Sequence, residues 1–179
     1  MSDPRSFVLG SVGVSADAAD LESAATLSQL KLKRLADLPQ LSLDAALSAD
    51  LLSDGPTLIA GTGAARFDAS VAAAYGVPLV LLVDKKGANV DLVAADASEV
   101  GAVVADVVTA DELSSVGDKL GVDAQPVIGP ELFQHNLLSQ AKAVGAHIVL
   151  PEGDDDRILE AASELLAQGV AKLTILGDP

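Results

Sequence analysis

The stretch from Ile148 to Arg157 holds the residues of this sequence that are best placed to do chemistry. It reads Ile-Val-Leu-Pro-Glu-Gly-Asp-Asp-Asp-Arg, which predicts a strand, a loop and a helix that begins at about Asp154. Open α/β sheets bind ligands at the loops that leave the carboxyl ends of their strands. Arg157 falls in the first helical turn, where the helix dipole disfavours a cation. Arg157 is therefore a candidate ligand for an anion, and the alternative is a salt bridge to Asp154 or Asp156.

Other candidate sites carry weaker signals. Gly61-Thr62-Gly63 follows a predicted strand and precedes a helix, so its backbone amides are placed as in an anion-binding turn. The sequence lacks Gly-x-x-x-x-Gly-Lys-Ser/Thr and the third glycine of a dinucleotide fingerprint, so a tight turn is the favoured interpretation. Lys85-Lys86 indicates a solvated loop. His135 and His147 have no second histidine or nearby acid at ligand spacing, so we expect no metal site.

Composition excludes several classes of protein. The 179 residues include 26 acidic and 11 basic side chains, and the net charge of −15 argues against nucleic acid and anionic membrane partners. The absence of cysteine excludes disulfides and thiolate chemistry. The longest apolar stretch, Val71 to Val83, is too short to span a bilayer, and Met1 to Arg5 lack a signal pattern. We therefore expect a cytoplasmic protein.

Hydrophobic periodicity predicts alternating strands and helices. Strands are expected at 7–9, 57–60, 79–83, 147–150 and 173–176. Helices are expected at 16–38 with a break near Lys33, and at 43–52, 67–75, 89–108, 109–120, 132–144 and 154–168. The helix at 109–120 begins with a capping box, Thr109 with Glu112, and Gly76 is placed as a helix C-cap.

This alternation predicts an α/β fold with parallel strands. The segment from Ala124 to Pro130 contains two prolines and a glycine, and is the best domain boundary. We expect a three-layer parallel-sheet domain in residues 1–130, followed in residues 131–179 by the opening βαβ unit of a second α/β domain.

The second part resembles the start of the catalytic domain of the phosphate acetyltransferase family. The resemblance lies in Leu150-Pro151-Glu152-Gly153-Asp154-Asp155-Asp156-Arg157, in Gly169-Val170-Ala171 and in Leu176-Gly177-Asp178-Pro179, and the match begins at Leu132-Phe133-Gln134. Residues 1–130 are compatible with the dethiobiotin-synthetase-like accessory domain of long bacterial members, in a degenerate form without the phosphate-binding loop.

The resemblance implies an acyltransferase that interconverts acetyl-CoA plus phosphate with acetyl phosphate plus CoA, as in acetate metabolism. It implies no metal, cofactor or covalent intermediate, and a homo-oligomer. The family's catalytic Ser, Arg and Asp would lie beyond Pro179, so only Arg157 is carried over, as a ligand for an anionic group of CoA or phosphate. The chain is then an N-terminal portion that is inactive alone.

Two alternatives remain open at this point. The segment does not separate phosphate acetyltransferase from phosphate butyryltransferase activity. Residues 1–130 are also compatible with a non-catalytic regulatory or assembly module.

Overall fold

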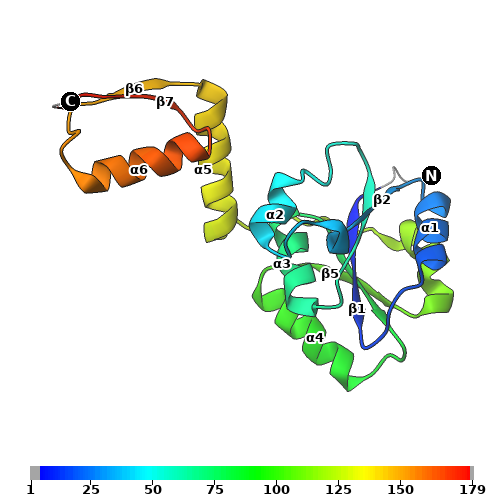
Figure 1. Cartoon of the computed structure of the whole chain (residues 1–179). Helices are drawn as coiled ribbons and strands as arrows, with labels where there is room; N and C mark the ends of the chain where they lie inside the picture. The colour runs from blue at the N-terminus through cyan, green and yellow to red at the C-terminus, as the bar shows by residue number, and fades with distance from the viewer. Residues whose placement is uncertain (1–4, 178–179) are drawn as a thin grey trace. The chain divides into compact units, whose positions relative to one another are not determined.

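The computed structural model describes residues 5–177, apart from the side chains of residues 88 and 117–119. The contacts between residues divide the chain into two compact units, Met1–Gly129 and Pro130–Pro179 (Figure 1). Among the residues described, no helix has the length and apolar character needed to cross a membrane.

The first unit is built on a parallel sheet of five strands, which confirms the predicted α/β class. The strands are β1 (Phe7–Val12), β2 (Lys31–Arg34), β3 (Thr57–Ala60), β4 (Leu79–Val83) and β5 (Val104–Val108), in the order β2-β3-β1-β4-β5. The helices are α1 (Ala18–Leu27), α2 (Leu43–Ser48), α3 (Ala65–Tyr75) and α4 (Ala88–Glu99), with 3-10 helices η1 (Leu35–Asp37) and η2 (Ala110–Lys119). The predicted capping box of Thr109 and Glu112 opens η2.

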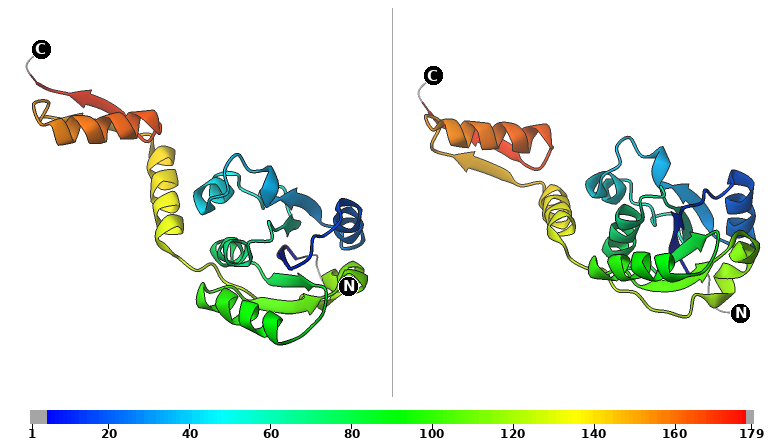
Figure 2. Two further views of the ribbon diagram at one scale, coloured as in Figure 1. Left: turned by 60° about the horizontal axis from the view of Figure 1, so that its bottom comes forward. Right: turned by 90° about the horizontal axis from the view of Figure 1, so that it is seen from below.

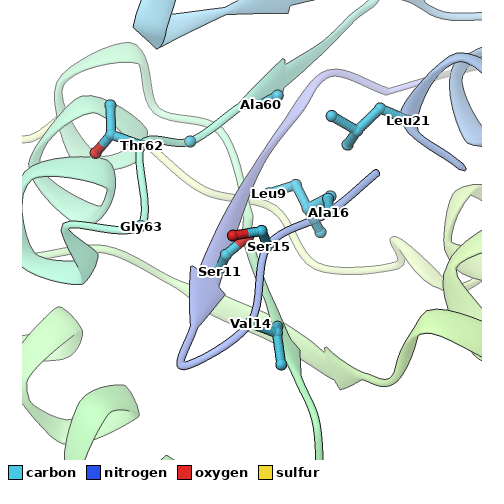
Figure 3. A pocket seen from close by; sticks show the side chains of 10 residues that line it. Leu9, Ser11, Val14, Ser15, Ala16, Leu21, Ala60, Thr62 and Gly63 are labelled. Carbon is cyan, nitrogen blue, oxygen red and sulfur yellow. The ribbon is translucent and has the colours of Figure 1, made fainter. Parts of the chain in front are cut away.

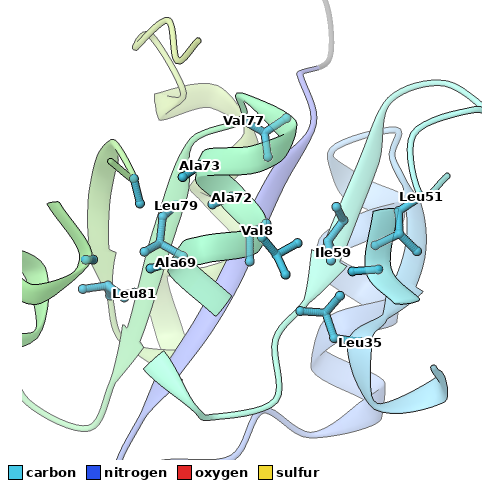
Figure 4. Close-up of a cluster of buried hydrophobic side chains, with 14 of the residues drawn as sticks. Val8, Leu35, Leu51, Ile59, Ala69, Ala72, Ala73, Val77, Leu79 and Leu81 are labelled. Carbon is cyan, nitrogen blue, oxygen red and sulfur yellow. The ribbon is translucent and has the colours of Figure 1, made fainter. Parts of the chain in front are cut away.

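Alternation along the central strands divides the core between the two faces of the sheet. Phe7 and Leu9 of β1 pack with α1 and η2, whereas Val8 packs with α2, α3 and α4 on the other face. Figure 2 shows this sheet between its two helical layers, and Figure 4 shows the cluster around Val8, Ile59 and Leu79. The unit therefore has the three layers expected from the sequence.

The long helix predicted over 16–38 is wrong in its second half. Helix α1 ends at Leu27, and Gln29 takes a left-handed conformation with φ of 57°, which terminates the helix as glycine commonly does. The next residues form β2 at the edge of the sheet, where Lys31 and Lys33 leave only a weak apolar signal. Lysine on an edge strand discourages pairing with another chain, which explains why this strand does not look like a buried one.

The helix predicted over 89–108 is also wrong in its second half. Helix α4 ends at Glu99, and Gly101 follows with φ of 88°. An alanine Cβ at this glycine would lie 2.7 Å from Val127 Cγ2, so the position requires glycine for space as well as for conformation. The residues after it form β5, the other edge strand, whose β-branched valines favour extended structure.

The second unit contains α5 (Pro130–Val144), β6 (His147–Leu150), α6 (Asp156–Ala167) and β7 (Lys172–Ile175). The two strands pair in parallel, with Leu150 opposite Ile175, and α6 connects them. This confirms the predicted βαβ unit. Few side chains are buried within it (Leu132, Ala162 and Val170), and large apolar side chains such as Phe133, Leu137 and Leu166 are more than half exposed.

Candidate functional site

The loop between β6 and α6 runs from the carboxyl end of a strand into a helix, as predicted. Strand β6 ends at Leu150 and α6 begins at Asp156, with Asp155 as its N-cap. The Asp155 carboxylate accepts a hydrogen bond of 2.9 Å from the Arg157 backbone N–H. A carboxylate at this position satisfies a free amide and interacts favourably with the positive end of the helix dipole.

The close approach of residue 153 to the strand end at Leu176 explains why this position is a glycine. Its N–H donates to the Leu176 carbonyl oxygen at 2.9 Å, and a Cβ at residue 153 would lie 2.7 Å from that same oxygen. A Cβ at Gly177 would in turn lie 3.2 Å from Gly153 Cα. Two pieces of the sequence pattern, the loop at 150–157 and the strand end at 176–177, therefore meet backbone to backbone. Asp178 and Pro179, the rest of the second piece, lie outside the described residues.

Arg157 lies in the first turn of α6, as predicted, but its ion-pair partner is neither Asp154 nor Asp156. Its Nε and Nη2 donate to the two oxygens of Asp155, at 3.0 and 2.6 Å. Asp155 is the N-cap, so its carboxylate faces the first helical turn and meets the guanidinium that emerges there. The correction follows from where the helix begins, which decides which of three consecutive aspartates is the cap.

The hydrogen bonds within this pair favour the ionised form of each partner. Those from the Arg157 side chain and backbone lower the pKa of Asp155, and the same contact raises the pKa of Arg157. The Arg157 side chain is 89% exposed, and its Nη1 has no partner in the part of the chain that the structure describes. The guanidinium is thus held in place at the carboxyl edge of β6 with donors left for an anion.

The Gly61-Thr62-Gly63 turn lies between β3 and α3, in the first unit, and its amides are already occupied. Asp68 of α3 accepts from Thr62 N at 2.9 Å, from Thr62 Oγ1 at 3.0 Å and from Gly63 N at 3.2 Å. Asp68 is fully buried, and burial raises its pKa while these hydrogen bonds lower it. A carboxylate of the chain itself takes the place that a phosphate would need, which supports the interpretation of this segment as a tight turn.

The remaining candidates show ordinary surface contacts. Lys86 pairs with Glu112 at 2.9 Å on the exposed surface. His147 Nε2 lies 2.8 Å from Thr174 Oγ1 on the neighbouring strand, and His135 is half-buried in α5. Within the residues described, no group of three His, Cys, Asp or Glu side chains is placed to hold a metal ion.

Comparison with known proteins relates the second unit to a known family. Residues 132–179 match the family described as phosphate acetyl/butaryl transferase. This segment is similar to that family. The resemblance expected from the loop at 150–157 and the motifs around it is thereby confirmed.

Curated relatives give the same result in three bacteria. The segment is similar to the phosphate acetyltransferase of Corynebacterium glutamicum, with 63% identity over 49 residues, which cover 27% of this chain and 15% of the relative. It is similar to that of Synechocystis, with 51% identity over 51 residues, covering 28% and 7%. It is also similar to that of Paracoccus denitrificans, with 56% identity over 39 residues, covering 22% and 12%. The chain thus spans a small part of the relatives that it matches, and no solved structure matches it.

Sequence reasoning missed two functional details of the structure. Asp68 gave no signal, because an aspartate six residues after a turn is unremarkable until the helix places it beneath that turn. Asp155 stood among three identical residues. No signal in the sequence separated Asp155 from its neighbours, because aspartate is a favourable N-cap at any of the three positions and periodicity does not fix the residue at which α6 begins.

Proposed function

We propose that this chain contributes the opening part of a phosphate acetyltransferase, which interconverts acetyl-CoA and phosphate with acetyl phosphate and CoA. The observation that carries the proposal is the family match over residues 132–179. The three relatives described above support the acetyl reaction, since each is a phosphate acetyltransferase.

In this proposal Arg157 binds an anionic group of CoA or phosphate. The Asp155 carboxylate holds the guanidinium by two hydrogen bonds, so little side-chain entropy is lost when a ligand arrives. The exposed guanidinium offers further N–H groups to phosphate oxygens, and the N-terminus of α6 adds a favourable dipole for an anion. Asp155 is then a positioning residue and Arg157 a substrate-binding residue.

The proposed reaction needs no metal or other cofactor, because acetyl transfer between a thiol and phosphate can be driven by general-base and electrostatic catalysis. The groups that would perform those steps are not among the residues assigned above. The proposal extends to acetate metabolism in the cytoplasm and to a homo-oligomeric enzyme.

Phosphate butyryltransferase activity is the second candidate, because the matching family includes both acyl groups in its description. The three relatives favour the acetyl group. For residues 1–130 we propose a dethiobiotin-synthetase-like accessory domain without nucleotide binding, with a regulatory or assembly role as the alternative. The occupied amides of the Gly61–Gly63 turn support the absence of nucleotide binding there.

The test is a segment exchange. The 49-residue stretch of the Corynebacterium glutamicum phosphate acetyltransferase that aligns with this chain is replaced by the sequence of this chain, where 63% of the residues are already identical. The chimera is assayed with acetyl-CoA and butyryl-CoA. Retained transfer supports the proposal, and the ratio of the two rates distinguishes the acyl groups.

A further inference from the structure

A cavity of about 160 Å³ lies at the carboxyl ends of β1 and β3 in the first unit (Figure 3). β1 leads into α1 on one face of the sheet, and β3 leads into α3 on the opposite face. The loops that follow the two strands therefore diverge. Open α/β sheets bind ligands in crevices at such points, where the strand order changes direction. The cavity has the position of a ligand site that the acetyl transfer proposed above does not use.

The lining combines apolar walls with hydroxyl groups. The apolar walls include Leu9, Val14, Leu21 and Ala60. The hydroxyls belong to Ser11 and Ser15 on the β1 side and to Thr62 across from them (Figure 3). The Thr62 hydroxyl is already bonded to Asp68, whereas those of Ser11 and Ser15 have no hydrogen-bond partner within the described residues. Each free hydroxyl can both donate and accept.

The residues that line the cavity carry no charge. Charged groups lie near its walls but not in its lining. Asp20, Asp84 and Asp111 line a neighbouring cavity that shares Val14, Ser15 and Ala16 with this one. Asp68 is buried behind Thr62 and accepts three hydrogen bonds, and Arg34, which pairs with Ala60 in the sheet, lies 3.6 Å from Glu22. Arg34 Nη2 is buried without a hydrogen bond and would favour an anion, whereas the carboxylates of the neighbouring cavity would favour a cation, and neither kind of group belongs to the lining. An ionised ligand would lose part of its hydration in the cavity without gaining a counter-charge from the lining.

We propose that this cavity binds an uncharged, hydroxylated small molecule of about six non-hydrogen atoms. The size follows from the volume, since an engineered cavity of about 150 Å³ holds one benzene molecule. The hydroxyls of Ser11 and Ser15 hold the polar end of the ligand, and the side chains of Leu9 and Leu21 cover its carbon skeleton. The site belongs to the first unit and is distinct from Arg157.

Three probes that share one carbon skeleton and differ in charge test whether the cavity prefers an uncharged ligand. 1,2-Propanediol is neutral, lactate is its anionic counterpart and 1-amino-2-propanol its cationic one. Each is titrated into the complete 179-residue chain at neutral pH while backbone amide shifts are followed by NMR. We expect saturable shifts with the diol, confined to Ser11, Ser15, Thr62 and Gly63, and affinities at least about tenfold lower for both ions.

Variants test the position. Ser15→Ala removes one exposed hydroxyl and should weaken diol binding roughly fivefold, the worth of one hydrogen bond. Ser11→Val, which also fills the cavity, should abolish binding, and Ser98→Ala on the outer surface of α4 is the matched control with no effect. Tighter binding of either ion, undiminished binding by Ser15→Ala, or shifts centred on Asp84 and Asp111 of the neighbouring cavity would each overturn the proposal.

Discussion

Replacing Asp68 tests whether a buried carboxylate holds the β3–α3 turn in place of a ligand. Asp68→Ala removes the acceptor of three hydrogen bonds from Thr62 and Gly63. Asp68→Asn keeps an oxygen for Thr62 but turns a donor towards the Gly63 N–H. Asp91→Asn, on the exposed side of α4, is the matched control.

The expected cost follows from these contacts. A hydrogen bond contributes about 0.5–1.5 kcal/mol net, so three of them are worth between about 1.5 and 4.5 kcal/mol. Removal of the carboxylate also relieves the unfavourable burial of a charge, which moves the expected loss towards the lower half of that range. We expect Asp68→Ala to lower the free energy of unfolding by about 2–3 kcal/mol, and Asp68→Asn by about 1 kcal/mol.

Urea unfolding followed by tyrosine fluorescence measures this directly. The chain has one tyrosine and no tryptophan. The Tyr75 hydroxyl donates to the Ala46 carbonyl at 2.7 Å and accepts from the Leu51 N–H at 3.1 Å, so its signal reports the unfolding of the first unit. An alanine variant as stable as the parent, or an asparagine variant more stable at pH 7, would refute the role given to Asp68.

The pH dependence of the same variants has a definite sign. Burial raises the pKa of Asp68 above its ordinary value of 3.8 in the folded chain. The stability contributed by the protonated form is therefore fully present below that value and is lost as pH rises through the folded pKa. The parent should lose this contribution as pH rises from about 3.8 through the folded pKa, and Asp68→Asn should not. An identical pH profile in both would contradict the raised pKa.

Three further predictions concern the second unit and the chain as a whole. Gly153→Ala should destabilise the second unit by about 1–3 kcal/mol, because the new Cβ would lie 2.7 Å from the Leu176 carbonyl oxygen. Hydrogen exchange of the β7 amides measures this loss, and unchanged protection of those amides would contradict the prediction. In the chimera, Arg157→Ala should raise KM for CoA or phosphate about ten- to a hundredfold, while the stability changes by less than about 1 kcal/mol. Arg157→Lys should recover part of the lost affinity. A lower melting temperature with unchanged KM would assign Arg157 a structural role instead. The 179-residue chain alone should show no acetyl-CoA:phosphate exchange above background in a thiol-release assay, because the match covers 15% of the Corynebacterium glutamicum relative; turnover would contradict this.

The buried strands were predictable because their signal is intrinsic to the sequence. Leu79 to Val83 is a continuous apolar run, and a strand covered by helices on both faces requires one. The edge strands were not predicted, for the opposite reason. Strand β2 lies at the edge of the sheet, where Lys31 is exposed and Lys33 is half-buried, so its sequence lacks the continuous apolar run of a central strand.

The site was predictable as a location but not as a set of contacts. The strand–loop–helix pattern of the sequence is sufficient to place Arg157 at the carboxyl edge of β6. Its pairing with Asp155 depends on the residue at which α6 begins, and helix ends are poorly determined by periodicity. The contact of Gly153 with Gly177 joins the segments that follow β6 and β7, which are separated in the sequence by α6, so only the folded structure shows it.

The most direct test of the central claim is the acetyl phosphate formed per second by the Corynebacterium glutamicum enzyme that carries this chain's matched segment. We predict kcat/KM within about tenfold of the unmodified enzyme, which corresponds to a change of no more than about 1.4 kcal/mol in the transition-state barrier. A chimera that folds with the parent's melting temperature and oligomeric state, yet forms no acetyl phosphate above background, would contradict the assignment of this segment to a phosphate acetyltransferase.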